Sequence, residues 1–335
     1  MSPQPRFTIV IPTLNRAHCL GRAVDSALAQ TYANLEVIVS NNGSRDNTAE
    51  VLAAYSDARL RVLQREQTIP ATAHGNFLIA QASGELFLGL SDDDYLEPGF
   101  VEAVVRRFLE DAAVVMVYTR CWVHYWDVPV PSALAPEIET GVQFLRAYYQ
   151  QQREVCWCAC VLKTAELRRI GPIPEGTIFG DMYYWTQIAY DGKVGFVSGL
   201  LSHYVYLDIN TPSASHSAPI LEWGRETAML ADRVVQRFVA DAMTPGEAAS
   251  LSGRMRRYTA NTVANQFVWL AIRGVRRSAL WRAAWQCAGL IGLRPGFWPH
   301  VVMGLLAPRR LLAALARAMA VSRRTQALER ENGRS

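Results

Sequence analysis

The sequence lacks the glycine-rich motifs of several large enzyme classes. No Gly-x-Gly-x-x-Gly turn, Walker loop or Gly-x-Ser-x-Gly elbow occurs among its 335 residues. Dinucleotide-dependent oxidoreductases, P-loop NTPases and α/β-hydrolases need those glycines to approach a phosphate or to expose a nucleophile. The sequence therefore gives no support to these three classes.

Paired cysteines and long apolar runs are also missing. None of the six cysteines forms a Cys-x2-Cys pair, so neither a zinc site nor a disulfide framework is expected. Cys156, Cys158 and Cys160 alternate, which predicts core thiols on one face of a strand over 155–162. A membrane span needs about 20 apolar residues, and the most apolar region, 281–308, is broken by Arg294 and two prolines.

Composition indicates a folded globular protein in a reducing compartment. Half of the residues are hydrophobic and 19% are charged, a balance that excludes a largely disordered chain. The first six residues are polar and show no signal-peptide core, so we expect a cytoplasmic location. The net charge is +4, and arginines gather near the end, which favours contact with an anionic membrane surface over nucleic acid.

The first third alternates between strands and helices. Apolar β-branched runs predict strands at 7–12, 35–39, 60–63 and 85–90, with helices at 17–30, 48–55 and 72–82 between them. This order predicts an α/β fold with a mostly parallel sheet and helices on both faces. Polar turns follow three of the strands, at Pro12–Arg16, Ser40–Asp46 and Ser91–Asp94, where such sheets bind ligands.

The rest of the chain changes character near residue 215. Further helices are expected at 101–109, 142–151, 164–170 and 182–190, and strands at 113–119, 193–197 and 202–206, with 127–139 as a loop. From about Pro219 the pattern is helical to the end. We therefore predict a catalytic domain over 1–215 and a helical region over 216–335.

Three adjacent carboxylates, Asp92, Asp93 and Asp94, form the sharpest candidate site. Like charges in contact must be offset, and Mg²⁺ or Mn²⁺ does this while bridging to a diphosphate. The alternative is a solvated acidic turn. His203 and Asp208 are candidates for a third metal ligand, although a single strand histidine is more often structural.

Two other polar positions have both a functional and a structural interpretation. Asn41, Asn42 and Asp46 follow a strand, where they either contact a base or form a turn in which Asp46 caps the next helix. Asp181 lies among aromatic residues that would raise its pKa and suit it to general-base work, or else it caps a helix.

These segments resemble one known family. In order and spacing, Phe7–Arg16, Ser26–Tyr32, Glu36–Thr48 and Ala82–Asp94 resemble the opening of family 2 glycosyltransferases, and Gly180-Asp181 resembles their catalytic-base position. The resemblance covers roughly residues 5–210.

The resemblance implies a GT-A fold and an inverting, hexosyltransferase-type transfer. The donor would be a UDP-, GDP- or dTDP-sugar, and the acceptor a glycan or lipid-linked sugar in cell-surface polysaccharide or glycolipid synthesis. Asp181 would be the base, Asp94 with Asp93 would hold Mn²⁺ or Mg²⁺, and Asp92 would hold the ribose. The other implied contacts to the nucleotide sugar are Pro12, Thr13, Asn15, Asn41, Asn42, Asp46, Asn76 and Asp93.

The sequence departs from the family pattern at three places. Asn41-Asn42 stands where the family usually has an Asp, which leaves the base preference open. His74-Gly75-Asn76 replaces Ala-Arg-Asn, so a basic contact to the donor is either missing or supplied by His74. The Tyr-Arg-x-His segment is blurred in 202–210, and the third metal ligand stays unassigned.

Amphipathic helices are expected after Ser278. Their apolar positions recur at helical spacing with arginines between them: Trp281, Trp285, Leu290, Ile291, Leu311, Leu312, Leu315 and Met319. They fit an interfacial helix on the inner face of the cell membrane, a helical cap, or a homodimer surface. Residues after Ala320 are expected to be frayed.

Two other functions stay open at the level of sequence. A nucleotidyltransferase also pairs an α/β fold with metal-bound acids, but would show a Gly-rich basic loop after the first strand, where Pro12–Arg16 stands. A catalytically silent scaffold would keep the fold, and Asn41-Asn42 is the feature that favours it.

Overall fold

The computed structural model describes residues 4–125, 128–205, 220–240, 244–272, 276–291 and 298–332. The chain forms two compact units. The α/β unit comprises 1–124, 131–145 and 153–206, and the helical unit comprises 125–130, 146–152 and 207–335. The predicted boundary near residue 215 lies outside the described residues.

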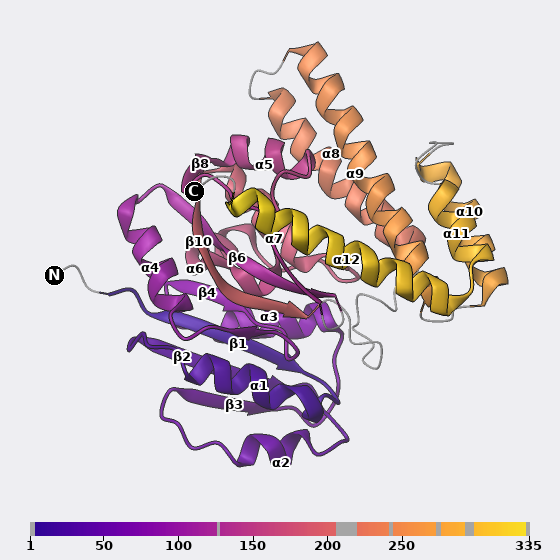
Figure 1. The fold of residues 1–335 in the computed structure, drawn as a ribbon. Helices are drawn as coiled ribbons and strands as arrows, with labels where there is room; N and C mark the ends of the chain where they lie inside the picture. Colours follow the sequence, from indigo (N-terminus) through magenta and orange to yellow (C-terminus); the bar gives the residue numbers. More distant parts are fainter. Residues whose placement is uncertain are drawn as a thin grey trace. The chain divides into compact units, whose positions relative to one another are not determined.

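A single mixed sheet runs through the α/β unit (Figure 1). Its strands are β1 (Phe7–Thr13), β2 (Leu35–Asn41), β3 (Leu60–Gln64), β4 (Leu86–Gly89), β5 (Tyr95–Leu96), β6 (Val114–Tyr125), β7 (Val128–Pro131), β8 (Ile138–Thr140), β9 (Cys160–Lys163) and β10 (Lys193–Val205). They follow the order β3-β2-β1-β4-β9-β6-β10-β5, and β8 pairs with β10. Neighbours from β3 to β4 are parallel, as are β6 and β10, whereas β9 runs antiparallel to both β4 and β6.

Helices cover both faces of this sheet, as predicted. The helices are α1 (Ala17–Leu28), α2 (Thr48–Ala53), α3 (Ala71–Gln81), α4 (Phe100–Glu110), α5 (Gly141–Tyr149), α6 (Thr164–Ile170) and α7 (Gly180–Tyr190). Alternate side chains of β1, such as Ile9 and Ile11, share one core with α1 and α4. The opposite face of β1 meets α3, on which Leu78 is buried. Each such apolar side chain stabilises the fold by about 1.5–3 kcal/mol.

Register in the parallel part of the sheet brings the polar turns to one edge. Thr13, the last residue of β1, lies opposite Asn41, the last residue of β2, and Val10 lies opposite Gly89, the last residue of β4. The three turns that follow these strands therefore leave the same end of the sheet. This confirms the predicted convergence.

The middle of the chain departs from the expected elements at three places. The cysteine strand begins only at Cys160, because Trp157–Ala159 forms a 3-10 turn in which the Trp157 indole lies where a Cβ on Gly89 would be. The expected loop at 127–139 contains β7 (Val128–Pro131) and the start of β8. The two strands expected at 193–197 and 202–206 form the single irregular strand β10.

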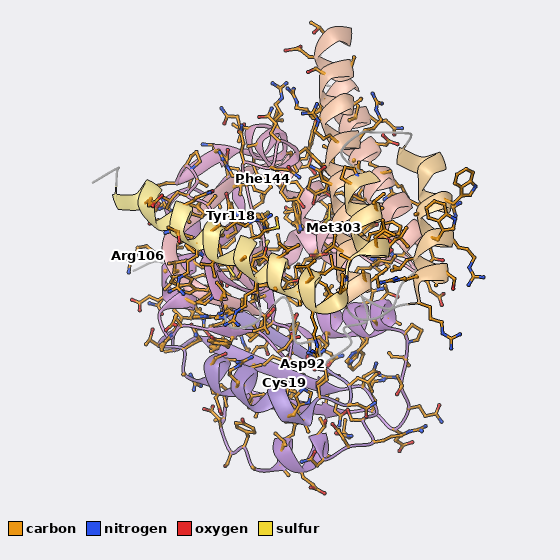
Figure 2. The ribbon with its side chains drawn as sticks, turned by 45° about the vertical axis from the view of Figure 1, so that its right-hand side comes forward. Cys19, Asp92, Arg106, Tyr118, Phe144 and Met303 are labelled. Carbon is orange, nitrogen blue, oxygen red and sulfur yellow. The ribbon has the colours of Figure 1, made fainter. Side chains whose placement is uncertain are left out.

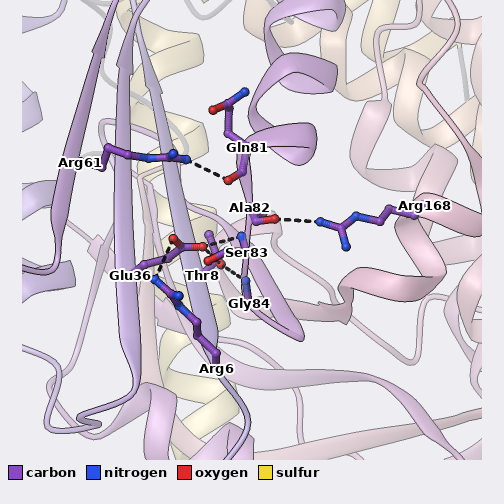
Figure 3. Close-up of polar contacts among 9 residues, drawn as sticks. All are labelled: Arg6, Thr8, Glu36, Arg61, Gln81, Ala82, Ser83, Gly84 and Arg168. Carbon is purple, nitrogen blue, oxygen red and sulfur yellow. Dashed lines mark hydrogen bonds and ion pairs between the residues drawn. The ribbon is translucent and has the colours of Figure 1, made fainter.

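The opposite, amino-terminal end of the sheet holds a buried carboxylate, Glu36 (Figure 3). Glu36 Oε1 accepts hydrogen bonds from the Thr8 hydroxyl (2.5 Å) and the Ser83 backbone N–H (2.6 Å). Burial alone would raise the pKa of Glu36, but these donors and the Arg6 guanidinium lower it. The Thr8 hydroxyl also accepts the Gly84 N–H (2.8 Å), so the network ties the end of α3 to the sheet.

The helical unit contains α8 (Ile220–Ala240), α9 (Pro245–Ile272), α10 (Arg277–Ile291), α11 (Trp298–Leu306) and α12 (Arg309–Asn332). Phe267 and Val263 of α9 pack with Leu280 of α10 and Leu312 of α12. Among the described residues, no helix combines the length and apolar character that a bilayer crossing requires.

Leu312 is buried in the core that α12 shares with α9 and α10. One prediction about this helix is wrong. The chain does not fray after Ala320, because α12 continues to Asn332 through a segment of strong helix formers without Gly or Pro. The side chains of Leu290 and Ile291 lie outside the described set.

Candidate active site

The first two polar turns are joined by side-chain to backbone hydrogen bonds. Asn15 has a positive φ of 55°, a region that asparagine tolerates, and its Oδ1 accepts the Arg45 N–H (2.7 Å). The Asn15 N–H donates to the Ser44 hydroxyl (2.8 Å), and Asp46 Oδ2 accepts the Ala17 N–H (3.1 Å). Asn15 and Asp46, both predicted to contact the donor, thus hold the two turns together in this structure.

The acidic turn lies against the start of α1. Arg16 Nε is 2.9 Å from Asp92 Oδ1, and Arg16 Nη2 is 2.5 Å from Asp93 Oδ2. Burial raises the pKa of Asp92, while the Arg16 charge and the Thr13 hydroxyl oppose that rise. Cys19, one turn along α1, lies beside Asp92 (Figure 2). The turn is therefore a buried ion-pair cluster, and the alternative of a solvated acidic turn is wrong.

Asp94 is fully buried, and its two carboxylate oxygens differ in their hydrogen-bond partners among the described residues. Its Oδ1 accepts the Val205 N–H at 2.8 Å. Its Oδ2 has no hydrogen-bond partner in the part of the chain that the structure describes. Burial and the adjacent Asp93 charge raise the pKa of Asp94 well above its usual range. A buried oxygen of this kind is costly without a donor or a cation.

These carboxylates fit a hard divalent cation that is shared with a ligand. Mg²⁺ is commonly held by one or two carboxylates together with substrate phosphates. The orphaned Asp94 Oδ2 and the neighbouring Asp93 carboxylate provide such a set. Within the described ranges, no group of three His, Cys, Asp or Glu side chains is arranged to hold a metal ion by itself.

His203 faces other side chains in this structure. Its Nδ1 lies 2.9 Å from His124 Nε2, its Nε2 lies 2.8 Å from Glu97 Oε1, and its ring stacks on Tyr95. These contacts match the structural interpretation of His203, and its role as the third metal ligand stays a prediction. The other candidate, Asp208, lies outside the described residues.

Both asparagines after β2 are buried and bonded to the chain. Asn41 Oδ1 accepts the Ser44 N–H (2.9 Å), and its amide donates to Gln64 (3.2 Å). Asn42 bonds both backbone groups of Ile69, at 2.9 and 3.1 Å. Each amide keeps one further donor and one lone pair, so contact with a nucleoside stays a prediction.

His74 does not supply the missing positive charge. Its Nε2 lies 2.7 Å from the Ser40 hydroxyl, and burial, with the nearby Arg65 charge, lowers the pKa of His74 to about 4. The imidazole is neutral at pH 7, so the expectation that His74 provides a basic contact is wrong. Arg65, which the sequence motifs do not include, is a cation near His74, and its guanidinium lies 5.2 Å from the Phe77 ring centroid. Its position directly after β3 was the available signal.

Asn76 positions the segment that leads to Asp181. Its side chain bonds both the N–H (2.8 Å) and the carbonyl (2.9 Å) of Ile173. The Ile173 side chain in turn fills the space where a Cβ on Gly180 would lie, 2.9 Å from its Cδ1. Asn76 thus acts as a brace between α3 and the start of α7, and its predicted contact with the donor stays untested.

The capping interpretation does not hold at the cap position of either helix. For Asp46 the cap position of α2 is Asn47, although Asp46 Oδ1 accepts the N–H of Thr48, the first residue of α2. For Asp181 that interpretation is wrong, because the cap position is Phe179, and Asp181 lies within the first turn of α7.

Asp94 and Asp181 each act electrostatically on a cysteine of one short segment. Burial raises the pKa of both the Cys158 and the Cys160 thiols, and the charge of Asp94 adds to the rise at Cys158, as the charge of Asp181 does at Cys160. Cys158 and Cys160 are two residues apart, so the predicted metal ligand and the predicted base are both close to the start of β9. Such an arrangement can serve a reaction that needs a cation and a base near each other.

Comparison with known proteins identifies the first half of the chain. Residues 8–158 match the family model described as Glycosyl transferase family 2. Chondroitin synthase of Pasteurella multocida (strain Pm70) is 40% identical over 117 residues, which are 34% of this chain and 12% of that protein. UDP-Glc:alpha-D-GlcNAc-diphosphoundecaprenol beta-1,3-glucosyltransferase WfgD of Escherichia coli is 24% identical over 192 residues, 57% of this chain and 72% of WfgD. This chain therefore spans a small part of the chondroitin synthase and most of WfgD.

Solved structures share the fold over nearly the whole chain. S. aureus TarS 1-349 in complex with UDP-GlcNAc matches with a TM-score of 0.62 at 18% identity, covering 98% of this chain and 92% of the TarS 1-349 chain. Mannosyltransferase PcManGT from Pyrobaculum calidifontis, in complex with GDP-Man and Mn²⁺, matches with a TM-score of 0.54 at 16% identity, covering 94% and 87%. The predicted GT-A fold with a helical C-terminal region is confirmed.

Proposed function

The chain belongs to glycosyl transferase family 2, and we propose that it transfers a sugar from a nucleotide-diphosphate sugar to an acceptor hydroxyl. The observation that carries this proposal is the buried acidic turn at the carboxyl end of β4, with Asp94 Oδ2 unpartnered among the described residues. Burying a carboxylate oxygen without a partner destabilises the fold, and a bound cation would offset this cost in an enzyme but not in a catalytically silent scaffold.

The donor would be a UDP-, GDP- or dTDP-sugar bound at the carboxyl ends of β1, β2 and β4. Pro12, Thr13 and the Asn41–Asn42 pair would line the nucleoside pocket, and Asp92 would accept hydrogen bonds from the ribose. Asn15 and Asp46 would then support this pocket through the turns that they hold, and Asn76 would position the segment that leads to Asp181. The UDP-GlcNAc complex of TarS and the GDP-Man complex of PcManGT support a nucleotide sugar of this kind.

Mn²⁺ or Mg²⁺ would be held by Asp94 and Asp93, with His203 as a further candidate ligand. When bound, the cation would neutralise negative charge on the departing nucleoside diphosphate. The fit of Asp94 Oδ2 and the Mn²⁺ in the PcManGT complex support this assignment.

Asp181 would act as the general base of an inverting transfer. Its carboxylate would take the proton of the acceptor hydroxyl as the acceptor oxygen bonds to the anomeric carbon. The bond from that carbon to the diphosphate oxygen breaks on the opposite face, and the electron pair leaves with the nucleoside diphosphate. The charge of Asp181 acts on the Cys160 thiol, two residues from the Cys158 thiol on which the charge of Asp94 acts, and this supports the role.

The acceptor would belong to cell-surface polysaccharide or glycolipid synthesis, on the cytoplasmic side of the membrane. The names of the chondroitin synthase and of WfgD support this class of substrate. A membrane-proximal acceptor also suits the exposed apolar side chains of the helical unit: Trp281, Trp285, Leu311, Leu315 and Met319. Flotation with anionic vesicles tests membrane contact, and a size measurement identifies a homodimer on the same helices.

The first experiment measures release of nucleoside diphosphate from a panel of UDP-, GDP- and dTDP-sugars with Mn²⁺ or Mg²⁺. Asp94→Asn should lower metal-dependent release by about 100-fold or more. Asp181→Asn should lower it by roughly 100-fold or more while nucleotide binding persists, because only the base is lost. Asp57→Asn is the matched control, since Asp57 pairs with Arg59 before β3, at the other end of the sheet.

The outcomes separate the proposed enzyme from a scaffold. Release that is unaffected by Asp94→Asn would contradict the metal assignment. No release from any donor, together with no nucleotide binding by calorimetry, would favour a silent scaffold. Binding without release would direct the search to the acceptor.

A further inference from the structure

The acidic turn already holds a cation that belongs to the chain. Arg16, the residue that precedes α1, lies between two carboxylates, 2.9 Å from Asp92 and 2.5 Å from Asp93. Its side chain is 12% exposed and that of Asp92 is 7% exposed, so water screens the cluster poorly. Burial alone would lower the pKa of Arg16, but the two carboxylates raise it, so the guanidinium keeps its charge.

A guanidinium and a divalent cation cannot both occupy this place without strong repulsion. Two positive groups a few ångströms apart in a poorly screened site oppose each other by several kcal/mol on the order-of-magnitude scale of Coulomb's law. Arg16 and the metal ion compete for Asp93, because Asp93 binds Arg16 in the structure and is a proposed ligand of the metal.

We infer that Arg16 is the resident counter-ion of the acidic turn, and that a metal–nucleotide complex displaces it from Asp93. This inference rests on the proposed function and adds to it a competition between a side chain and the metal. The metal alone binds weakly, because it must compete with Arg16. A nucleoside diphosphate assists, because its phosphates offer the displaced guanidinium a new bidentate partner.

A second arginine of α1 provides a matched control. Arg22 donates to the backbone carbonyl of Asp93 at 2.7 Å, and its guanidinium lies 4.4 Å from the Tyr95 ring centroid. Arg22 is thus close to the acidic turn and equally charged, but no ion pair joins it to a carboxylate of that turn among the described residues. Its removal should leave metal binding nearly unchanged.

The test is a titration of the full chain with Mn²⁺ in the absence of nucleotide. Electron paramagnetic resonance measures the Mn²⁺ that stays free. Arg16→Gln should tighten Mn²⁺ binding by about tenfold, because close charge pairs in poorly screened sites couple by at least one decade. Arg22→Gln should change it less than about twofold, since an exposed charge contributes little. Added UDP should tighten Mn²⁺ binding in the wild type more than in Arg16→Gln.

Folding is controlled by a second variant. Arg16→Gln leaves two buried carboxylates without their partner, so it could unfold the chain. Arg16→Lys keeps the charge but not the two-pronged geometry, and should bind Mn²⁺ with an affinity between those of the wild type and of Arg16→Gln. If only the lysine variant folds, it must still bind Mn²⁺ more tightly than the wild type does.

Unchanged or weaker Mn²⁺ binding in the Arg16 variants would overturn the inference, as would equal tightening in Arg22→Gln. UDP binding, measured separately by calorimetry, distinguishes this failure from that of the proposed function. If the protein binds UDP but the Arg16 substitutions have no effect on Mn²⁺ binding, only the counter-ion inference fails. If the protein binds no nucleotide, the proposed donor site fails.

Discussion

Replacing Asn76 by Ala separates its structural role from its predicted contact with the donor. The side chain makes two hydrogen bonds to the backbone of Ile173, which is half-buried between α6 and α7. Each bond contributes about 1 kcal/mol net, so Asn76→Ala should destabilise the protein by about 2 kcal/mol. For a unit of this size, the melting temperature should fall by roughly 4–8 °C.

The same substitution should also displace the predicted base. Ile173 packs against Gly180, the residue before Asp181, so a loosened Ile173 segment lets the start of α7 shift. We expect a lower kcat with an unchanged Kd for UDP, because Asn76 bonds the segment that leads to Asp181 rather than the nucleotide. Thermal unfolding and calorimetry with UDP measure the two effects.

The matched control is Asn34→Ala. Asn34 is exposed and its amide makes one hydrogen bond, to the carbonyl of Gln4 (2.9 Å). Its loss should cost less than about 0.5 kcal/mol, as is usual for surface positions. An Asn76→Ala protein that melts with the wild type but binds UDP weakly would refute the brace and restore Asn76 as a donor contact.

Three further predictions follow from buried groups. Gly84→Ala should destabilise the protein by about 3 kcal/mol, because its Cβ would lie 2.6–2.8 Å from atoms of Thr8 and Arg6, whereas Gly99→Ala, with nothing within 4 Å, should cost less than about 1 kcal/mol in denaturant unfolding. Folding lowers the pKa of Glu36, so ionised Glu36 contributes to the free energy of unfolding above roughly pH 4.3, the pKa of an ordinary glutamate. That contribution is lost as the pH falls through the lowered pKa. Glu36→Gln should therefore flatten this part of the stability–pH curve. The pKa of His74 is lowered to about 4, so the unfolded chain takes up a proton below about pH 6.5 that the folded chain refuses. The free energy of unfolding should fall as the pH is lowered from about 6.5 to about 4. The His74 resonances should not titrate between pH 6 and 8.

The sequence predicted those parts of the fold that depend on local pattern. The β-branched runs of β1 and β2 and the amphipathic helices between them carry their own periodicity, so both the elements and the edge where their turns meet could be inferred. The resemblance to family 2 added the GT-A fold, which no single motif specifies. β7 was missed because its two prolines favour a loop, although Val128 and Val130 are buried.

Partners that are far apart in the sequence could not be inferred from it. Asn76 and Ile173 are 97 residues apart, and Arg16 and Asp93 are 77 residues apart. Neither pair has a pattern of its own, because each depends on how α3, α7 and the acidic turn pack. The neutral state of His74 likewise follows from burial, which a motif position does not report.

Unused bonding capacity separates the predicted site residues from one another. Asn42 and Asn76 each bond both backbone groups of one residue, so folding alone accounts for their positions. Asp94 instead keeps a buried Oδ2 that no described group satisfies, at a cost on the order of 1–3 kcal/mol. An ionised carboxylate costs more to bury without a partner than the hydroxyl groups that share this state do, and a bound cation would offset that cost. On this argument, substitutions at the acidic turn should change donor binding more than substitutions at either asparagine.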